Sequence, residues 1–295
     1  MSITATHQKA ELSALARPSG AFAMLAIDQR ESMRAMFAEK QSAPVSDDQL
    51  IDFKLQALEV LTPHASAVLI DREFGWAAAI ERRAVAPSCG LIASADQFHA
   101  SSDEIVGDVT IDELVVPEAV REQGATALKL LVTWRPDEAP EKRIAMVDDF
   151  VARCRRAGLV SLIEPVSRKP RDGRSYDLQE GILAAARELG DRGQDIYKAE
   201  VPLQGAGDEA EVRHRCAELT KAIRSPWVVL SSGVQPDQFP TAVEWACKEG
   251  ASGFLAGRAV WKNTIGAADI RRALEGDGVE RLKRLCETVD RAVSQ

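Results

Sequence analysis

The segment DIYKAEVP, residues 195–202, is a short and almost wholly apolar run that ends at a proline. Such runs are typical of strands in a parallel sheet that is buried on both faces. Seven further runs of the same kind lie at 21–28 (AFAMLAID), 66–71 (SAVLID), 89–94 (CGLIAS), 125–133 (ATALKLLVT), 159–166 (LVSLIEPV), 227–233 (WVVLSSG) and 252–257 (SGFLAG). The sequence therefore predicts eight buried strands.

Segments with the apolar period of helices lie between these runs. Ser46 is a favourable N-cap residue at the start of one helix, and Gly158 is a favourable end for another. The main helices are expected over 46–61, 141–158, 176–190, 239–250 and 278–293.

Eight strands that alternate with helices in one chain predict an α/β protein of the (β/α)8 TIM-barrel type. An open, doubly wound sheet is the alternative fold. No linker or repeat interrupts the pattern, so we expect residues 1–295 to form a single domain. A helix at about 7–16 is expected to cap the bottom of the barrel, and residues 95–124 are expected to be partly irregular.

The composition of the chain indicates which binding partners and cofactors to expect. The chain has 295 residues, 45% of them apolar and 28% charged, with a net charge of −8, so no overall attraction for nucleic acid or an anionic membrane is expected. The five cysteines are scattered, no secretory signal begins the sequence, and no apolar run approaches a membrane span. The four histidines lack metal-ligand spacing. We therefore expect a cytoplasmic protein with neither metal nor other cofactor.

Polar side chains occur where the predicted strands end, which is where a (β/α)8 barrel has its active site. Alternation along residues 195–202 places Lys198 and Glu200 on one face and Tyr197 on the other. We expect Lys198 to point into the barrel mouth and Tyr197 to face the helices. Lys129 and Glu164, from the fourth and fifth strands, should converge on Lys198.

Lys198 has two possible roles. A lone lysine in a strand is often a buried cation neutralised by a carboxylate. Several polar residues at the ends of five strands favour a functional site instead. Burial and the neighbouring charge of Lys129 both favour a neutral Lys198 amine, which attacks ketones and aldehydes and so forms a Schiff base.

The ends of the last two strands resemble the usual phosphate site of these barrels, because glycine lets backbone N–H groups approach and arginine adds a charged clamp. The candidate residues are Ser231, Ser232, Gly233, Gly257 and Arg258. The basic segment RKPRDGR, 168–174, is either a lid that meets an anion or a solvated loop. The segment GAGDEA, 205–210, lacks the GxGxxG spacing, which argues against a dinucleotide site.

Taken together, several motifs resemble the class I aldolases of the tagatose-bisphosphate aldolase group, and most closely the sulfofructosephosphate aldolases of sulfoquinovose breakdown. The resemblance covers about residues 18–290 and is carried by GAFAMLAIDQRESMRAMF (20–37), ALKLLVTWRPDE (127–138), LIEPV (162–166), DIYKAEVPL (195–203), VVLSSGV (228–234) and ASGFLAGRAVW (251–261).

The resemblance implies a metal-free retro-aldol cleavage of 6-deoxy-6-sulfofructose 1-phosphate to dihydroxyacetone phosphate and 3-sulfolactaldehyde. It makes Lys198 the Schiff-base lysine, with Asp28, Lys129 and Glu164 around the reacting carbons. Glu164 is our first choice for the proton transfers, and Lys129 is expected to donate to substrate hydroxyls. The phosphate candidates named above would hold the phosphate of dihydroxyacetone phosphate.

The other end of such a substrate carries a second anion. Gln29, Arg30 and Arg72 are the candidates for binding a sulfonate there, with loop 168–174 as the second choice. A tagatose- or fructose-1,6-bisphosphate aldolase remains an alternative, as does a regulatory barrel without catalytic activity. A homo-oligomer is expected.

Overall fold

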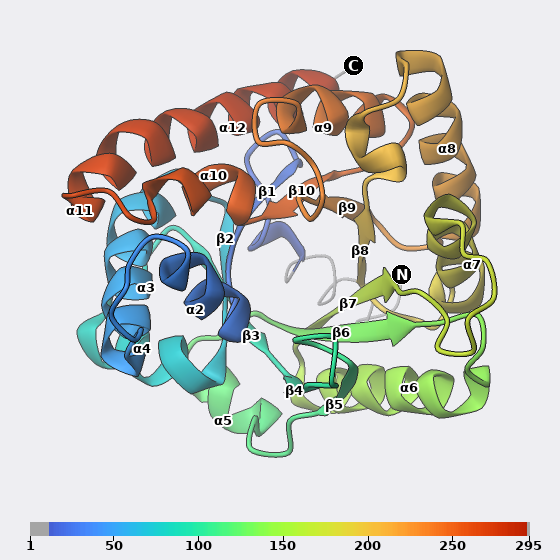
Figure 1. The fold of residues 1–295 in the computed structure, drawn as a ribbon, viewed down its shortest axis with the longest axis horizontal. Coiled ribbons are helices and arrows are strands. Elements are labelled where there is room, and N and C mark those ends of the chain that lie inside the picture. The colour runs from blue at the N-terminus through green and yellow to red at the C-terminus, as the bar shows by residue number, and fades with distance from the viewer. Residues whose placement is uncertain (1–11, 294–295) are drawn as a thin grey trace.

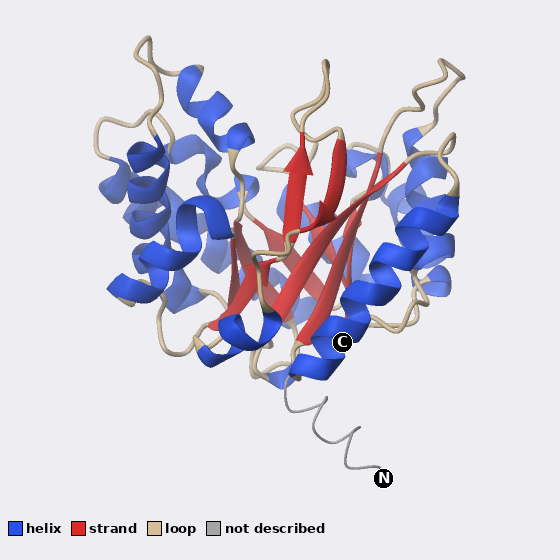
Figure 2. Cartoon of the chain, turned by 90° about the horizontal axis from the view of Figure 1, so that it is seen from below, coloured by secondary structure: helices blue, strands red, loops and turns tan. Residues whose placement is uncertain are grey.

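The computed structural model describes residues 12–293, which form a closed barrel of eight parallel strands in the order β1-β10-β9-β8-β7-β6-β3-β2. Figure 1 shows the helices around the barrel, and Figure 2 shows the strands inside this ring. All eight predicted strands are present, so the predicted single-domain (β/α)8 barrel is confirmed. The barrel strands are β1 (Phe22–Ile27), β2 (Ala67–Ile70), β3 (Gly90–Ser94), β6 (Ala127–Trp134), β7 (Val160–Ser167), β8 (Ile196–Glu200), β9 (Trp227–Leu230) and β10 (Gly253–Ala256).

The region expected to be partly irregular contains an antiparallel hairpin of β4 (Asp96–His99) and β5 (Asp108–Ile111). It begins directly after β3, and the register pairs Phe98 with Val109. The sequence pattern did not reveal these strands because each has only four residues and a mixed pattern of burial. The hairpin replaces the start of an ordinary strand-to-helix connection at this position in the barrel.

The predicted helix ends are largely confirmed. The Ser46 hydroxyl accepts a hydrogen bond from the Gln49 N–H at 3.2 Å, and Gly158 ends its helix in the left-handed conformation with φ +65°. The helices are α2 (Glu31–Ala38), α3 (Asp47–Leu61), η1 (Thr62–His64), η2 (Arg72–Trp76), α4 (Ala77–Arg82), α5 (Pro117–Glu122), α6 (Pro140–Ala157), α7 (Leu178–Leu189), η3 (Pro202–Gly205), α8 (Glu209–Ala222), α9 (Phe239–Lys248), α10 (Arg258–Trp261), η4 (Lys262–Thr264), α11 (Ile270–Ala273), η5 (Leu274–Gly278) and α12 (Val279–Val293). Among these described helices, none is long and apolar enough to cross a membrane.

The buried apolar side chains form two clusters, one inside the barrel and one between the strands and the helices. Ile196 belongs to the inner cluster and Tyr197 to the outer one, which confirms the predicted strand parity. Leu15 also packs in the inner cluster, beside residues such as Phe22 near the start of β1. Residues 7–11 of the predicted capping helix lie outside the described residues, so that helix stays a prediction.

Candidate active site

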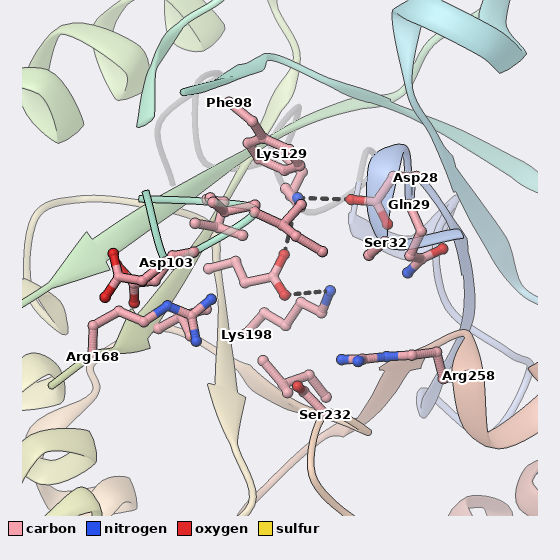
Figure 3. Close-up of a pocket in the computed structure, with 17 residues that line it drawn as sticks. Asp28, Gln29, Ser32, Phe98, Asp103, Lys129, Arg168, Lys198, Ser232 and Arg258 are labelled. Atoms are coloured by element: carbon pink, nitrogen blue, oxygen red, sulfur yellow. Dashed lines mark ion pairs between the residues drawn. The ribbon is translucent and has the colours of Figure 1, made fainter. Parts of the chain in front are cut away.

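A cavity of about 490 Å³ opens at the carboxyl ends of the barrel strands. Figure 3 shows the side chains around it. All four predicted catalytic residues lie on its wall. The lining residues are Asp28, Gln29, Ser32, Phe98, Asp103, Glu104, Ile105, Val106, Lys129, Leu131, Glu164, Val166, Arg168, Lys198, Leu230, Ser232 and Arg258.

Lys198 is the only charged residue of β8 on this wall, and it projects into the barrel mouth as its position in the strand predicts. Its amine lies 2.8 Å from Glu164 Oε1, at the end of a side chain that is only 4% exposed. Glu164 comes from the neighbouring strand β7. The pair therefore places a carboxylate within proton-transfer distance of a sheltered amine.

Lys129 lies at the centre of three carboxylates. Its Nζ is 2.8 Å from Asp28 Oδ2, 2.8 Å from Asp96 Oδ2 and 3.0 Å from Glu164 Oε2. Burial works to lower the pKa of Lys129, but the three carboxylates outweigh it and raise this pKa well above its usual value. Lys129 is therefore a permanent cation, and its three N–H groups are directed at carboxylates. This arrangement does not favour the predicted donation to substrate hydroxyls.

Asp96 is a member of this cluster that the sequence analysis missed. It is fully buried at the start of the β4–β5 hairpin, and it accepts hydrogen bonds from the Leu131 N–H at 3.0 Å and from Arg30 Nη2 at 3.0 Å. Burial works to raise the pKa of Asp96, but Lys129 and Arg30 lower it, and the net shift is downward. A polar residue just beyond the third predicted strand was the available signal.

Asp28 is held in place from both sides of the barrel wall. Burial works to raise its pKa, but the charges of Lys129 and Lys198 hold the pKa below its usual range, so Asp28 is a carboxylate. From outside the barrel, the buried amine of Lys54 donates to the carbonyl oxygens of Ile27 at 3.0 Å and Gln29 at 2.7 Å. These carbonyls flank Asp28 and fix the backbone that carries it.

Glu200 lies differently from the prediction. Although it is on the same face of β8 as Lys198, it does not line the cavity, and its Oε2 accepts a hydrogen bond from the Ser167 N–H at 2.8 Å. Burial raises the pKa of Glu200 to about 7, and the nearby Glu164 adds to this shift.

Two of the five predicted phosphate residues line the cavity. Ser232 and Arg258 line it, and Gly233 has φ +79°, a conformation that favours glycine. At Gly257 a Cβ would lie 2.1 Å from the carbonyl oxygen of Ala26, so only glycine fits this approach of β10 to β1. Burial lowers the pKa of Arg258, and the carboxylates of Glu164 and Asp28 act against that shift. Ser231 is buried beside Ser232 and does not line the cavity.

The predicted sulfonate residues are not brought together, and two of them need correction. Gln29 lines the cavity, with its Oε1 buried and without a hydrogen-bond partner among the described residues. Arg30 stacks on the ring of Phe98 at 4.2 Å and does not line the cavity, because the buried Asp96 holds its guanidinium.

Arg72 also lies away from the main cavity. Its Nε is 2.7 Å from Asp112 Oδ2, and it lines a separate small pocket. Strand-end position alone did not distinguish these arginines from residues that face the cavity.

Arg168 is the cation that the structure places in the cavity instead. It is the first residue of the basic segment 168–174, and its Nε is buried without a hydrogen-bond partner among the described residues. Figure 3 shows Arg168 and Arg258 on opposite sides of Lys198. Residues 103–106, between β4 and β5, complete the wall on the Arg168 side.

This fold and site define a barrel enzyme with a buried lysine in its mouth, flanked by a carboxylate and two arginines. Residues 22–263 match the family of DeoC/LacD family aldolases, so the chain belongs to this family. The chain is accordingly an aldolase, an enzyme of the aldehyde-lyase kind. This finding favours the enzyme over the regulatory barrel considered above.

Curated relatives agree with the family. The chain is 29% identical to the tagatose 1,6-diphosphate aldolase of Listeria monocytogenes serotype 4a (strain HCC23), over 95% of this chain and 90% of the relative. It is 25% identical to tagatose 1,6-diphosphate aldolase 2 of Streptococcus pyogenes serotype M3 (strain ATCC BAA-595 / MGAS315), over 100% of this chain and 98% of the relative.

Solved structures show the same fold at lower identity. An archaeal fructose 1,6-bisphosphate aldolase has a TM-score of 0.62 at 16% identity, over 96% of this chain and 99% of that one. A fructose-bisphosphate aldolase from Slackia heliotrinireducens DSM 20476 has a TM-score of 0.66 at 16% identity, over 93% of this chain and 90% of that one.

Proposed function

We propose that the protein is a Schiff-base aldolase in which Lys198 is the nucleophile. The observation that carries this proposal is the contact of 2.8 Å between the sheltered Lys198 amine and Glu164. A neutral amine is required for attack on a ketone, and Glu164 can take its proton.

The proposed reaction begins with attack of Lys198 Nζ on the C2 ketone of a ketose phosphate. Loss of water from the carbinolamine gives an iminium ion, and Glu164 moves the protons in this step. A carboxylate then removes the C4 hydroxyl proton, and the C3–C4 bond breaks with its electron pair passing to the iminium. An aldehyde leaves, the enamine is protonated at C3, and water releases dihydroxyacetone phosphate from Lys198.

Glu164 is our first choice for the C4 hydroxyl proton, since it lies between the two lysines. Asp28 is the second carboxylate on the cavity wall and would orient the hydroxyl groups or share this work. Ser231, Ser232, Gly233, Gly257 and Arg258 would bind the C1 phosphate, with Ser232 and Arg258 in direct contact.

Two cations on opposite sides of Lys198 suit a substrate with an anion at each end. Arg258 would hold the phosphate beside C1, and Arg168 would meet the second anion, with Gln29 as a further donor. A phosphorylated ketose agrees with the relatives, which are named for tagatose 1,6-diphosphate. Binding of the second anion by Arg30 or Arg72 is not proposed, because both are held away from the cavity.

The preferred substrate is 6-deoxy-6-sulfofructose 1-phosphate, with 3-sulfolactaldehyde as the aldehyde product. Next to Arg168 the wall also contains Asp103 (Figure 3) and Glu104, and Glu104 is paired with the buried Arg135. A sulfonate carries one negative charge, whereas a phosphate ester carries about 1.5 to 2 at pH 7. Arg168 is thus the cation of this wall that faces the cavity, and the Asp103 carboxylate beside it favours the singly charged end. The second candidate is tagatose or fructose 1,6-bisphosphate, which the names of the relatives favour.

The ratio of kcat/KM values for the three substrates tests the proposal. We expect the sulfonated substrate to exceed both bisphosphates by roughly tenfold or more. A bisphosphate with the higher kcat/KM would establish the second candidate. We further expect a chelator to leave the activity unchanged, and a loss of activity that zinc restores would contradict a metal-free mechanism. A cytoplasmic location and a homo-oligomer stay predictions.

A further inference from the structure

Two segments that are distant in sequence form the side of the cavity around Arg168. The first is the hairpin tip, residues 100–107 between β4 and β5, which contributes residues 103–106. The second is the basic loop, residues 168–174 after β7, which contributes Arg168. We call these lining residues, 103–106 and 168, the far wall. The backbone of the basic loop is anchored, because the Arg168 N–H donates to the Trp134 carbonyl oxygen at 2.9 Å and the Arg171 N–H donates to Asp137 at 2.6 Å. Both segments lack regular structure, however, and no sheet pairing joins the hairpin tip to the loop.

Arg135 joins these two segments. It follows β6 directly and is only 2% exposed. Its Nη2 donates to the carboxylate of Glu104 in the hairpin tip, and its Nη1 donates to the carbonyl oxygen of Lys169 in the basic loop. Lys169 is the neighbour of Arg168, so the anchored carbonyl lies one residue from the cation that faces the cavity. The two Nη atoms of one buried guanidinium therefore bind both parts of the far wall.

Arg171 makes a second, more exposed connection between the same segments. Its Nη2 donates to the Gly107 carbonyl oxygen at 2.7 Å, and its Nη1 donates to Glu138 at 3.0 Å. Glu138 Oε1 also lies 3.5 Å from Arg135 Nε. Arg171 is half exposed, so water weakens its contacts more than those of Arg135. The buried guanidinium is the stronger of the two connections.

We propose that Arg135 is a positioning residue that determines substrate specificity by clamping the hairpin tip to the basic loop. This inference rests on the proposed function, because it assumes that Arg168 meets the second anion of the substrate. Without the clamp, the hairpin tip moves away from the basic loop, and the Arg168 side chain loses the wall that fixes its direction, although its backbone N–H stays bonded to Trp134. Substrates that reach the far wall then bind more weakly, whereas dihydroxyacetone phosphate, which occupies only the Lys198 and Arg258 side, is unaffected.

The test compares one variant in two reactions. Arg135→Met is assayed for cleavage of 6-deoxy-6-sulfofructose 1-phosphate and of tagatose 1,6-bisphosphate, and for exchange of the C3 proton of dihydroxyacetone phosphate with solvent deuterium. We expect KM for the cleaved substrates to rise roughly tenfold to a hundredfold, the effect of losing a charge-assisted hydrogen bond. We expect the exchange rate and its KM to stay within about twofold of wild type.

A matched control separates the clamp from the general effect of removing a buried arginine. Arg143 is also buried, and its Nε pairs with Glu188 at 2.5 Å between α6 and α7; it does not line the cavity. Arg143→Met should leave KM unchanged in both reactions. In an enzyme that already carries Arg168→Met, adding Arg135→Met should raise KM for cleavage by less than about twofold, because the effect of Arg135 passes through Arg168.

If Arg135→Met fails to fold, Arg135→Lys replaces it. Lysine keeps the charge but cannot reach both acceptors as a planar fork does, so a smaller rise in KM in cleavage alone is expected. An equal rise of KM in cleavage and in proton exchange, or no change of KM in either reaction, would overturn the clamp. A wild-type enzyme that neither cleaves these substrates nor exchanges the proton would instead overturn the proposed function.

Discussion

Lys129 shows how the barrel keeps a cation in its interior. A lone ammonium there would lose its proton, but the carboxylates of Asp28, Asp96 and Glu164 lie within 3.0 Å of it. The cost of burial is offset only because the charges are paired and hydrogen-bonded. Glu164 touches both lysines, so it connects this fixed charge to the Lys198 amine, whose protonation state the reaction must change.

Glu200 provides a residue-level prediction about stability and pH. Its folded-state pKa is raised to about 7 by burial, so between pH 4.5 and 7 the folded protein holds a proton that the unfolded chain has released. Stability is therefore lost as the pH rises through this window. The Glu200→Gln variant lacks this titration. Its free energy of unfolding minus that of wild type should therefore be larger at pH 8 than at pH 5, by on the order of 3 kcal/mol.

Urea unfolding of both proteins at pH 5 and pH 8 measures this difference. Glutamine keeps a carbonyl oxygen that accepts from the Ser167 N–H, so the hydrogen bond is retained in the variant. A free-energy difference between the two proteins that is the same at both pH values would show that Glu200 titrates normally.

At the scale of elements, the junction of β10 with α10 depends on a glycine. A Cβ on Gly257 would lie 2.1 Å from the backbone oxygen of Ala26 in β1 and 2.8 Å from Trp261 Nε1. Gly257→Ala should therefore push β10 away from β1, cost about 1–3 kcal/mol of stability and raise KM for phosphorylated substrates. Denaturant unfolding and steady-state kinetics measure the two effects.

Gly276 is the matched control for this substitution. It lies in η5, and a Cβ there would meet no atom within 4 Å. Gly276→Ala should leave KM unchanged and should raise stability by at most about 1 kcal/mol, because alanine suits a helix better than glycine. Equal effects at the two glycines would contradict the close-approach explanation.

The sequence predicted elements whose signals are local. Eight apolar runs marked the barrel strands, and the two-residue period of β8 predicted the direction of Lys198. The β4–β5 hairpin was missed because its short strands have a mixed pattern of burial and so form no apolar run. The same failure hid Asp96. The sequence also ranked Arg30 ahead of loop 168–174 for the second anion, because which arginine faces the cavity depends on partners far away in sequence.

At the scale of the whole molecule, a core that stabilises the fold and the candidate active site lie at opposite ends of the barrel. Leu15 is fully buried in the inner cluster, beside residues near the starts of the strands, whereas the cavity lies at their ends. Leu15→Ala should lower the free energy of unfolding by about 2–5 kcal/mol through the void it leaves, with kcat/KM within twofold of wild type.

Leu114 provides the comparison, because it is 71% exposed. Leu114→Ala should change neither quantity appreciably, since a surface substitution usually stays within about 0.5 kcal/mol. Thermal or denaturant unfolding with parallel kinetics would measure both variants. A large loss of kcat/KM in Leu15→Ala, with the protein still folded, would show that the two ends of the barrel are coupled.

Borohydride reduction in the presence of dihydroxyacetone phosphate, followed by peptide mass spectrometry, tests the central claim most directly. A Schiff base becomes a stable secondary amine on reduction, so the adduct marks the nucleophile. We predict one adduct, on Lys198, and none in Lys198→Ala. An unlabelled Lys198, or an adduct on Lys129 in its place, would contradict the mechanism.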